Sequence, residues 1–284
     1  MSNTILSSLD LDPIVKLALE EDLVHGDVTT NALVSSDSIT NATIVAREPL
    51  TLAGIPLLQK IFELLDSSVT LQVHRIDGET IQVGETIASL RGSTRSILKG
   101  ERTALNFLQH LSGIATITKT FCDAVRKYPT KILDTRKTIP GLRRLEKWAV
   151  AIGSGTNHRM SLNDGILIKD NHIATLRSQG MDIAKICRLA KAKGPHGLKI
   201  FVEIESLDEI EQAIEGQAAV LLLDNMPPEL VRQAVNQIKG RAIVEVSGGI
   251  TLDNVLEFAA AGADYISIGS LTHSAPAVNM SLEI

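Results

Sequence analysis

Short, continuous apolar runs recur along the second half of the chain, and segments with helical spacing separate most of them. Runs of this kind are typical of parallel strands that are covered by helices on both faces. The candidate strands are Lys131–Thr135, Gly165–Lys169, Ile200–Glu205, Ala219–Leu223, Ala242–Val246 and Tyr265–Ile268. Amphipathic helices are expected at Leu207–Glu215, Pro228–Ile238 and Leu252–Ala261. The pattern therefore predicts repeated β-α units around a parallel sheet.

The N-terminal part of the chain follows a different pattern, in which alternating runs and helical segments are mixed. Helical spacing predicts helices at residues 10–22 and Ile55–Leu65, and residues 25–30 (HGDVTT) are predicted to form a turn. Apolar and polar positions alternate, as in half-buried strands, at Ala42–Arg47, Thr70–Arg75 and Thr80–Leu90. This part of the chain is therefore expected to form an α+β sandwich.

A long helical pattern links the two parts. It begins at Thr94, and Gly113 is expected to break it because glycine is unfavourable inside a helix. A boundary at this glycine gives an N-terminal sandwich domain at residues 1–113 and a second domain at residues 114–274. The tail, residues 275–284, can pack back on the first domain.

The second domain is predicted to be a barrel rather than an open sheet, because polar side chains follow nearly every strand. In a β/α barrel the carboxyl ends of all strands meet at one mouth, where the active site lies. An open sheet brings together the ends of two or three strands at its crevice. Since six strands can be identified, fewer than a complete barrel has, the predicted fold class is α/β: an N-terminal α+β sandwich followed by a reduced, six- or seven-stranded α/β barrel.

Composition excludes several classes of protein. The chain of 284 residues is 44% hydrophobic and 21% charged, as expected for a globular protein of one or two domains. It has no apolar run of about 18 residues, and residues 1–12 do not resemble a secretory signal, so we expect no membrane partner. Two cysteines and no zinc-ligand spacing favour a cytoplasmic location. With 3% aromatic residues, we expect no nucleic-acid partner.

Positive charge is concentrated in the segment Ile132–Asn171, although the chain has a net charge of −5. The basic side chains of this segment are Arg136, Lys137, Arg143, Arg144, Lys147, His158, Arg159 and Lys169. Such a concentration in an acidic protein predicts a pocket for a small polyanion. Positions close to strand ends favour binding roles for Arg136, His158, Arg159 and Lys169. For the three on a predicted helix face, Arg143, Arg144 and Lys147, surface ion pairs are an equal alternative.

Carboxylates follow at the next strands. Glu203 and Glu205 alternate within one strand and therefore point to the same side, and Asp224 ends the following strand. Acidic side chains at a barrel mouth can hold ribose hydroxyls, coordinate Mg²⁺ or lie near a developing positive charge. The alternative is a structural ion pair with Lys169 or Lys137, and both roles can coexist.

Glycine turns end the last two strands, at Ser247-Gly248-Gly249 and at Gly269-Ser270. Glycine lets a ligand approach the backbone closely, and exposed N–H groups at a helix start bind anions. We therefore expect a phosphate at these turns, each of which is predicted to lead into a helix.

Arg102 lies in the long helix before the barrel, where it cannot easily reach the mouth of its own barrel. We hypothesise that it completes the pocket of a neighbouring subunit. A solvated helical arginine is the alternative.

Several motifs together resemble the quinolinate phosphoribosyltransferase family. They are EDLVHGDVTT, GERTALNFLQHLSGIAT, ILDTRKTIPGLRRLEKWAVAIGSGTNHRMSL, ILIKDNHI, VEIES, LLLDNM, EVSGGIT and ISIGSLTHSAP, in family order from about Glu20 to Pro276. The DTRKT-PGLR and NHR motifs are specific to this family, whereas SGG and LLDN are not.

The resemblance implies an activity in NAD biosynthesis: transfer of a phosphoribosyl group from phosphoribosyl pyrophosphate to quinolinate, giving nicotinate mononucleotide, pyrophosphate and CO₂. It also implies Mg²⁺ as cofactor and a homodimer or hexamer. Arg102 of a neighbouring subunit would join Arg136, His158, Arg159 and Lys169 around the quinolinate carboxylates. Lys137 and Lys169 would face the pyrophosphate, while Glu203 and Asp224 would lie near the ribose and Mg²⁺. Lys137, Lys169, Glu203 and Asp224 are the candidate catalytic residues. The remaining candidate substrate-binding residues are Thr135 and, for the 5′-phosphate, Ser247, Gly248, Gly249, Ile268, Gly269 and Ser270.

Other functions remain open at this point. A related phosphoribosyltransferase-like protein acting on another anionic heterocycle would carry many of the same residues. A Schiff-base aldolase using Lys169 and a non-catalytic binder of phosphorylated metabolites are further alternatives.

Overall fold

The computed structural model describes residues 10–284, which divide into two compact units. The first unit contains the described residues up to Lys119, together with Arg144–Ser154 and Ser274–Ile284. The second contains Thr120–Arg143 and Gly155–His273. Residues 1–9, which carry most of the segment that argues against a secretory signal, lie outside the described residues.

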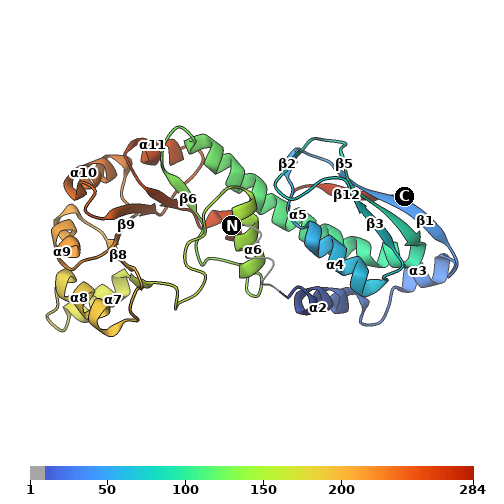
Figure 1. The fold of residues 1–284 in the computed structure, drawn as a ribbon, viewed down its shortest axis with the longest axis horizontal. Helices are drawn as coiled ribbons and strands as arrows, with labels where there is room; N and C mark the ends of the chain where they lie inside the picture. The colour runs from blue at the N-terminus through green and yellow to red at the C-terminus, as the bar shows by residue number, and fades with distance from the viewer. Residues whose placement is uncertain (1–9) are drawn as a thin grey trace. The chain divides into compact units, whose positions relative to one another are not determined.

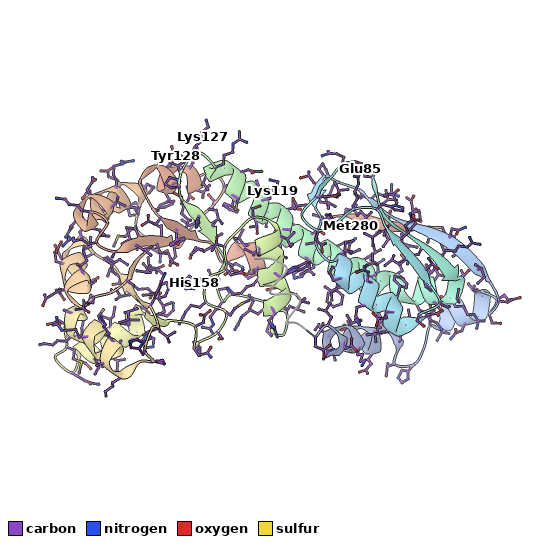
Figure 2. The ribbon with its side chains drawn as sticks, in the orientation of Figure 1. Glu85, Lys119, Lys127, Tyr128, His158 and Met280 are labelled. Atoms are coloured by element: carbon purple, nitrogen blue, oxygen red, sulfur yellow. The ribbon has the colours of Figure 1, made fainter. Side chains whose placement is uncertain are left out.

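The first unit is built on a four-stranded antiparallel sheet with the order β12-β1-β5-β3 (Figure 1). Its strands are β1 (Ile39–Ala46), β3 (Thr70–Val73), β5 (Thr86–Ser93) and β12 (Met280–Glu283); a small second sheet pairs β2 (Leu50–Thr51) with β4 (Thr80–Ile81). Strand β12, which contains Met280 (Figure 2), comes from the C-terminal tail and pairs with β1. The predicted alternating run Thr80–Leu90 forms two strands, β4 and β5, with a turn at Gly84 between them.

The helices that begin in the first half of the chain are α2 (Asp12–Leu23), α3 (Val28–Leu33), α4 (Ile55–Leu65) and α5 (Thr94–Val125). The predicted helices at residues 10–22 and Ile55–Leu65 are confirmed, and each begins with a proline in its first turn, where the missing N–H costs nothing. The turn predicted at residues 25–30 is wrong in its second half. Asp27 accepts the backbone N–H of Thr30 (2.8 Å) and so caps a helix that starts at Val28.

Helix α5 is continuous from Thr94 to Val125, so the break predicted at Gly113 is wrong. A Cβ atom at Gly113 would lie 2.1 Å from the carbonyl oxygen of Pro276 in the C-terminal tail. Glycine at this position therefore lets the tail pass close to the helix. Figure 2 shows Lys127 and Tyr128 beyond the end of α5, where the N–H of Tyr128 donates to the carbonyl of Val125 (2.8 Å).

Helix α6 (Arg143–Ile152) buries two charged residues, Glu146 and Lys147. The alternative that Lys147 forms a surface ion pair is therefore wrong, whereas Arg144 is exposed. Glu146 pairs with His110 of α5 through Nε2 (3.0 Å). The charged side chains of this helix are not all exposed, because α6 is buried on most of its sides.

The second unit is a reduced α/β barrel whose six parallel strands have the order β6-β11-β10-β9-β8-β7. The strands are β6 (Lys131–Leu133), β7 (Ile166–Ile168), β8 (Ile200–Ile204), β9 (Val220–Asp224), β10 (Ile243–Ser247) and β11 (Tyr265–Ser267). All six predicted strands are confirmed, with ends that differ by at most two residues. Buried apolar side chains such as Val202, Leu221 and Val246 form the core of this sheet.

Helices surround these strands. They are α7 (Asp170–Arg177), α8 (Ile183–Lys193), η1 (Leu207–Glu209), α9 (Ile210–Glu215), α10 (Pro228–Ile238), α11 (Val255–Ala260) and α12 (Ser270–His273). Figure 1 shows α8, α9, α10 and α11 on the outer side of the strands. The helix predicted at Pro228–Ile238 is confirmed in full, the one at Leu252–Ala261 begins later, and α7 and α8 were not predicted.

The sheet has β6 and β7 at its two edges, and the segment before β7 connects them. Thr156 forms a parallel bridge with Leu133 of β6, and its N–H donates to the carbonyl of Ile132 (2.8 Å). Nη1 of Arg159 donates to the carbonyl of Gly165, next to β7 (3.0 Å). The segment thus links both edges of the sheet while it presents His158 and Arg159.

Among the described residues, none of the helices combines the length and the apolar character that crossing a bilayer requires.

Candidate active site

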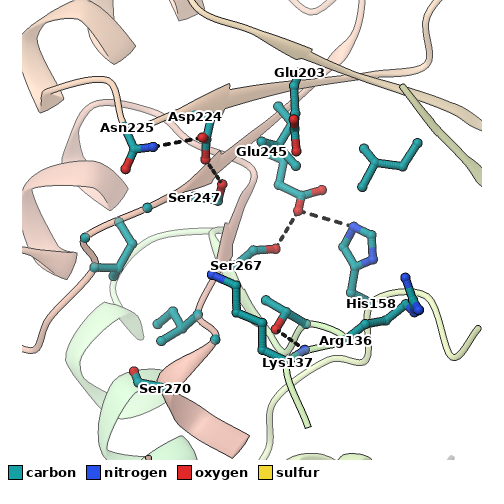
Figure 3. Close-up of a pocket in the computed structure, with 18 of the residues that line it drawn as sticks. Arg136, Lys137, His158, Glu203, Asp224, Asn225, Glu245, Ser247, Ser267 and Ser270 are labelled. Carbon is teal, nitrogen blue, oxygen red and sulfur yellow. Dashed lines mark hydrogen bonds and ion pairs between the residues drawn. The ribbon is translucent and has the colours of Figure 1, made fainter. Parts of the chain in front are cut away.

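A cavity of about 760 Å³ lies at the carboxyl ends of the barrel strands (Figure 3). Its walls include all but one of the predicted site residues, namely Thr135, Arg136, Lys137, His158, Arg159, Lys169, Glu203, Asp224, Ser247, Gly248, Gly249, Ile268, Gly269 and Ser270. Cations, carboxylates and glycine turns that are far apart in the sequence therefore share one cavity.

Two arginines bring unsatisfied donors to this cavity. The buried Nε atoms of Arg136 and Arg159 have no hydrogen-bond partner among the described residues. Burial, followed by the neighbouring charge of Arg136, lowers the pKa of Arg159. An unpaired buried donor costs about 1–3 kcal/mol, and a guanidinium can bind a carboxylate or phosphate through two parallel hydrogen bonds. The pair is therefore arranged for an anionic ligand.

His158 is held in the barrel rather than at the surface. Its backbone N–H donates to Oδ1 of Asp134 (2.8 Å), a fully buried carboxylate that also accepts Nδ2 of Asn157 (2.6 Å). Its ring packs on Phe201, with a centroid distance of 5.3 Å. Asp134 follows β6 directly, so it fixes the start of the NHR motif against that strand.

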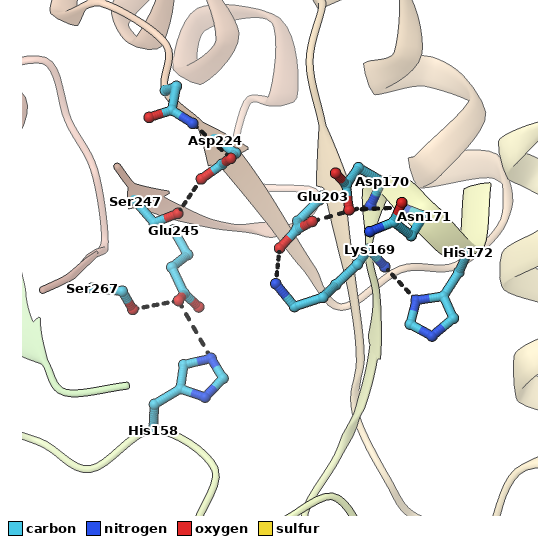
Figure 4. Close-up of polar contacts among 11 residues, drawn as sticks. His158, Lys169, Asp170, Asn171, His172, Glu203, Asp224, Glu245, Ser247 and Ser267 are labelled. Carbon is cyan, nitrogen blue, oxygen red and sulfur yellow. Dashed lines mark hydrogen bonds and ion pairs between the residues drawn. The ribbon is translucent and has the colours of Figure 1, made fainter. Parts of the chain in front are cut away.

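Lys169, which directly follows β7, forms an ion pair with Glu203 of the neighbouring strand β8 (Figure 4). Nζ of Lys169 lies 2.8 Å from Oε1 of Glu203, and Oε2 accepts the N–H of Asp170 (3.1 Å). The ion pair considered from the sequence is therefore present. The Lys169 side chain is 50% exposed, whereas a Schiff-base lysine is usually activated by desolvation or by a neighbouring cation. Glu205 is exposed beyond the end of β8.

Asp224 is coupled to the glycine turn that ends β10. It accepts hydrogen bonds from Oγ of Ser247 (2.6 Å) and from Nδ2 of Asn225 (2.8 Å). Gly248 has a φ of +92°, and a Cβ atom there would lie 2.1 Å from Oδ1 of Asn225. Only glycine at 248 leaves room for the Asn225 side chain, which lies between this turn and Asp224.

The two glycine turns lead into different structures. Gly269 leads directly into the short helix α12, and a Cβ atom there would lie 2.9 Å from Cδ of Lys137. The turn at Ser247–Gly249 does not lead directly into a helix, because α11 begins at Val255, so that prediction is wrong. Instead, Asn254 orders the intervening loop by donating from Nδ2 to the carbonyl of Gly249 (2.9 Å).

Arg102 is the predicted site residue that does not line the cavity. It lies on α5 in the first unit, and its side chain is exposed. Its role in a neighbouring subunit stays a prediction. Of the other cations, Arg143 supports the loop after β6 by donating from Nε to Oγ1 of Thr138 (3.0 Å).

Sequence reasoning missed two residues deeper in the cavity, Glu245 and Ser267. Glu245 is 1% exposed and accepts a hydrogen bond from Oγ of Ser267 (2.5 Å). One signal was available: a single glutamate stands inside the apolar run of residues 243–247 (IVEVS), where a buried carboxylate requires a partner.

The chain is similar in sequence to proteins of one family along nearly its whole length. Quinolinate phosphoribosyl transferase profiles match residues 27–112 (N-terminal domain) and 114–283 (C-terminal domain). The probable nicotinate-nucleotide pyrophosphorylase (carboxylating) of Bacillus subtilis (strain 168) is 40% identical over 279 residues, covering 98% of this chain and 95% of the relative. The Mycobacterium leprae (strain TN) nicotinate-nucleotide pyrophosphorylase (carboxylating) is 38% identical, covering 95% of each chain.

Solved structures give the same result. NadC from Streptococcus pyogenes has a TM-score of 0.92 and 39% identity, with 98% of each chain covered. The nicotinate-nucleotide pyrophosphorylase from Francisella tularensis has a TM-score of 0.90 and 37% identity, with 97% of each chain covered. The similarities extend through both units, and the chain belongs to the quinolinate phosphoribosyltransferase family.

Proposed function

We propose that this protein joins quinolinate to phosphoribosyl pyrophosphate and releases pyrophosphate and CO₂, giving nicotinate mononucleotide for NAD biosynthesis. One observation carries the proposal: the unpartnered buried nitrogens of Arg136 and Arg159 share a cavity with the Ser247–Gly249 turn. A dicarboxylate suits the two guanidinium groups, and a phosphate suits a glycine turn with exposed N–H groups. The family of the chain supports the same pair of substrates.

The quinolinate half of the proposal uses the cationic wall. The two carboxylates lie among Arg136, His158, Arg159 and Lys169. Fixed guanidinium groups orient the ring so that its nitrogen faces the anomeric carbon of the sugar. Such positioning lowers the barrier by removing the entropic cost of bringing two reactants together.

The phosphoribosyl half uses Lys169 again, together with Lys137, the two carboxylates and the glycine turns. Lys137 and Lys169 face the pyrophosphate, and Glu203 and Asp224 hold the ribose hydroxyls. The 5′-phosphate lies on the turns at Ser247–Gly249 and Ile268–Ser270. Thr135 orders this region, since its Oγ1 accepts the N–H of Lys137 (3.0 Å). Hydrogen bonds to Asp224 and Glu203 are present in advance, so little reorganisation is needed during the reaction.

The chemistry follows from the weak nucleophilicity of the pyridine nitrogen. Pyrophosphate leaves well ahead of bond formation, and positive charge develops on the ribose. Glu203 and Asp224 stabilise that charge, while Lys137 and Lys169 stabilise the leaving group. After ring attachment, the C2–carboxylate bond breaks, CO₂ departs, and the cationic pyridinium stabilises the electron pair on C2 until a proton adds there.

We propose that Mg²⁺ enters with the phosphates of phosphoribosyl pyrophosphate. Among residues 10–284, no group of three or more His, Cys, Asp or Glu side chains is arranged to hold a metal ion. Mg²⁺ commonly binds through substrate phosphates and one or two carboxylates, which fits Glu203 and Asp224. When bound, Mg²⁺ would neutralise charge on the leaving pyrophosphate.

We also propose that Arg102 completes the quinolinate site of a neighbouring subunit in a homodimer or hexamer. The support is its exposure on α5 and its absence from the walls of the cavity in its own chain. Mixing Arg102→Ala subunits with Lys169→Ala subunits should restore part of the activity, because one site of the mixed dimer then has both residues. Mixed dimers without recovered activity would refute the shared site.

The direct test is an assay with quinolinate and phosphoribosyl pyrophosphate, with and without magnesium. We expect nicotinate mononucleotide, pyrophosphate and CO₂ in equal amounts. Turnover of another anionic heterocycle with no turnover of quinolinate would favour the related phosphoribosyltransferase-like alternative. The cytoplasmic location predicted from the cysteine content stays a prediction.

A further inference from the structure

Glu245 is a buried carboxylate to which the proposed reaction assigns no role. It comes from β10, and its side chain is 1% exposed. Oε1 accepts Oγ of Ser267 and lies 3.3 Å from Nε2 of His158 (Figure 4), while Oε2 has no partner in the described part of the chain. A buried carboxylate destabilises the folded state unless it is well paired. An apolar residue would fill this place at lower cost, so stability alone does not explain the glutamate.

The ring of His158 is engaged at both of its nitrogens. Nδ1 accepts the backbone N–H of Arg159 (2.6 Å), and Nε2 faces Glu245. Because Nδ1 uses its lone pair as an acceptor, the ring proton lies on Nε2 and donates to Glu245. The Arg159 N–H and the Glu245 carboxylate thus favour the same tautomer, and the carboxylate holds the Nε2 side of the ring in one orientation.

The same ring connects Glu245 to an anion-binding side chain. The hydrogen bond from the N–H of Arg159 fixes the backbone at that residue, from which the guanidinium enters the cavity. Nη1 is held by the carbonyl of Gly165, and Nε remains available to a ligand. Glu245 therefore contacts the His158 ring, and the ring in turn contacts Arg159. Figure 3 shows the contact between Glu245 and His158.

We propose that Glu245 is a positioning residue for the carboxylate-binding edge of the site. It locks His158 in the Nε2–H tautomer, and the Nδ1 contact then holds Arg159 where its guanidinium meets the ligand. The proposal rests on the proposed function for the identity of the ligand, a pyridine dicarboxylate, but not for the state of the His158 ring.

Two substitutions separate hydrogen-bond acceptance from charge. Glu245→Leu removes the acceptor, so we expect the KM for quinolinate to rise about tenfold or more, because a small misplacement of binding groups is costly. The KM for phosphoribosyl pyrophosphate should stay within about twofold, and kcat should change less than the KM for quinolinate. Glu245→Gln keeps an oxygen that accepts the ring proton and should largely restore the KM.

The matched control is Glu211→Leu, which removes an exposed carboxylate that pairs with Arg241 outside the cavity. An unchanged KM for quinolinate in Glu245→Leu, or an equal rise in the KM of both substrates, would overturn the proposal. If Glu245→Leu does not fold, the smaller Glu245→Ala removes the same acceptor and takes its place.

A second measurement does not depend on substrate. Long-range ¹H–¹⁵N correlation spectra of the ligand-free protein report which ring nitrogen of each of the seven histidines carries a proton. The His158 signals are assigned by their absence in His158→Gln. We expect the Nε2–H form in the wild type and in Glu245→Gln, and loss of that pattern in Glu245→Leu. The same tautomer in all three would contradict the proposal, whereas a wild type that fails to turn over quinolinate would contradict the proposed function alone.

Discussion

The two units of this protein use their buried polar groups in opposite ways. In the first unit, Ser112 hydrogen-bonds both the N–H and the carbonyl of Ala53, and Asp77 accepts two N–H groups at the start of α4. In the barrel unit, Arg136, Arg159 and Glu245 each leave a buried atom without a partner, whereas the described residues of the first unit include one such atom, on Thr118. Unsatisfied buried groups destabilise a fold, so their concentration in one cavity indicates a region kept for ligand binding.

Arg159→Ala tests the barrel side of this comparison most strongly. We expect kcat/KM for quinolinate to fall about 100-fold or more, because a desolvated carboxylate loses its guanidinium partner. Stability should fall by about 1–3 kcal/mol, because the carbonyl of Gly165 loses the hydrogen bond from Nη1. Steady-state kinetics and thermal unfolding check both expectations, with the exposed Arg232→Ala as control. Near-wild-type kinetics in Arg159→Ala would remove this residue from the site.

Gly248→Ala tests the glycine turn in the barrel. The new Cβ atom would lie 2.1 Å from Oδ1 of Asn225, at a φ that strains any other residue. We expect the turn to shift and the KM for phosphoribosyl pyrophosphate to rise about tenfold or more, with a smaller effect on quinolinate binding. An unchanged KM for phosphoribosyl pyrophosphate would show that the 5′-phosphate lies elsewhere.

Gly113→Ala makes an equally close contact in the first unit, where a Cβ atom would lie 2.1 Å from the carbonyl oxygen of Pro276. Here we expect lower stability, by about 1–3 kcal/mol as for other overpacked sites, and unchanged KM values. Thermal unfolding and kinetics on the same sample compare the two glycines. Altered substrate affinity without loss of stability would contradict a purely structural role for Gly113.

Two aspartates that accept N–H groups at helix starts, one in each unit, should make stability depend on pH in opposite directions. Burial raises the pKa of Asp77 to about 6, whereas the hydrogen bond from the N–H of Lys185 lowers the pKa of Asp182. Folded Asp77 therefore keeps its proton up to about pH 6, while the unfolded chain releases it near 3.8. The folded state binds more protons in this window, so stability falls as pH rises from about 4 to 6.

The difference in stability between wild type and Asp77→Asn isolates this effect. We expect the wild type to lose up to about 2 kcal/mol relative to Asp77→Asn between pH 4 and pH 6. The sign is opposite for Asp182, whose contribution is present above its unfolded pKa and disappears as pH falls. Denaturant titrations of Asp77→Asn and Asp182→Asn at several pH values check both signs, and parallel profiles would refute the contrast.

Much of the fold could be predicted from the sequence because its signals are local. The helix at Pro228–Ile238 has a proline at its start and a strong apolar stripe, and each barrel strand is a short apolar run. The tail, residues 275–284, was expected to pack back on the first domain, but the pairing of its strand β12 with β1 and the role of Gly113 were not predictable, since both depend on contacts with distant segments.

The candidate site shows the same division. Residues at strand ends, such as Arg136 and Asp224, could be identified because parallel strands bring their carboxyl ends together. Glu245 was missed because it lies inside a strand, where its partners His158 and Ser267 come from other segments. A buried carboxylate is tolerated only where partner side chains lie beside it in the fold. The spacing of residues along the sequence does not show which side chains these are.

The most direct test of the central claim is a calorimetric comparison of quinolinate and nicotinate binding to the ligand-free protein. Nicotinate lacks one of the two carboxylates. If the unpartnered Nε atoms of Arg136 and Arg159 bind a dicarboxylate, quinolinate should bind about 30- to 100-fold more tightly than nicotinate. This ratio is expected for one buried charge-assisted contact of about 2–3 kcal/mol. Equal affinities would contradict the account, because the second carboxylate would then have no partner in the cavity.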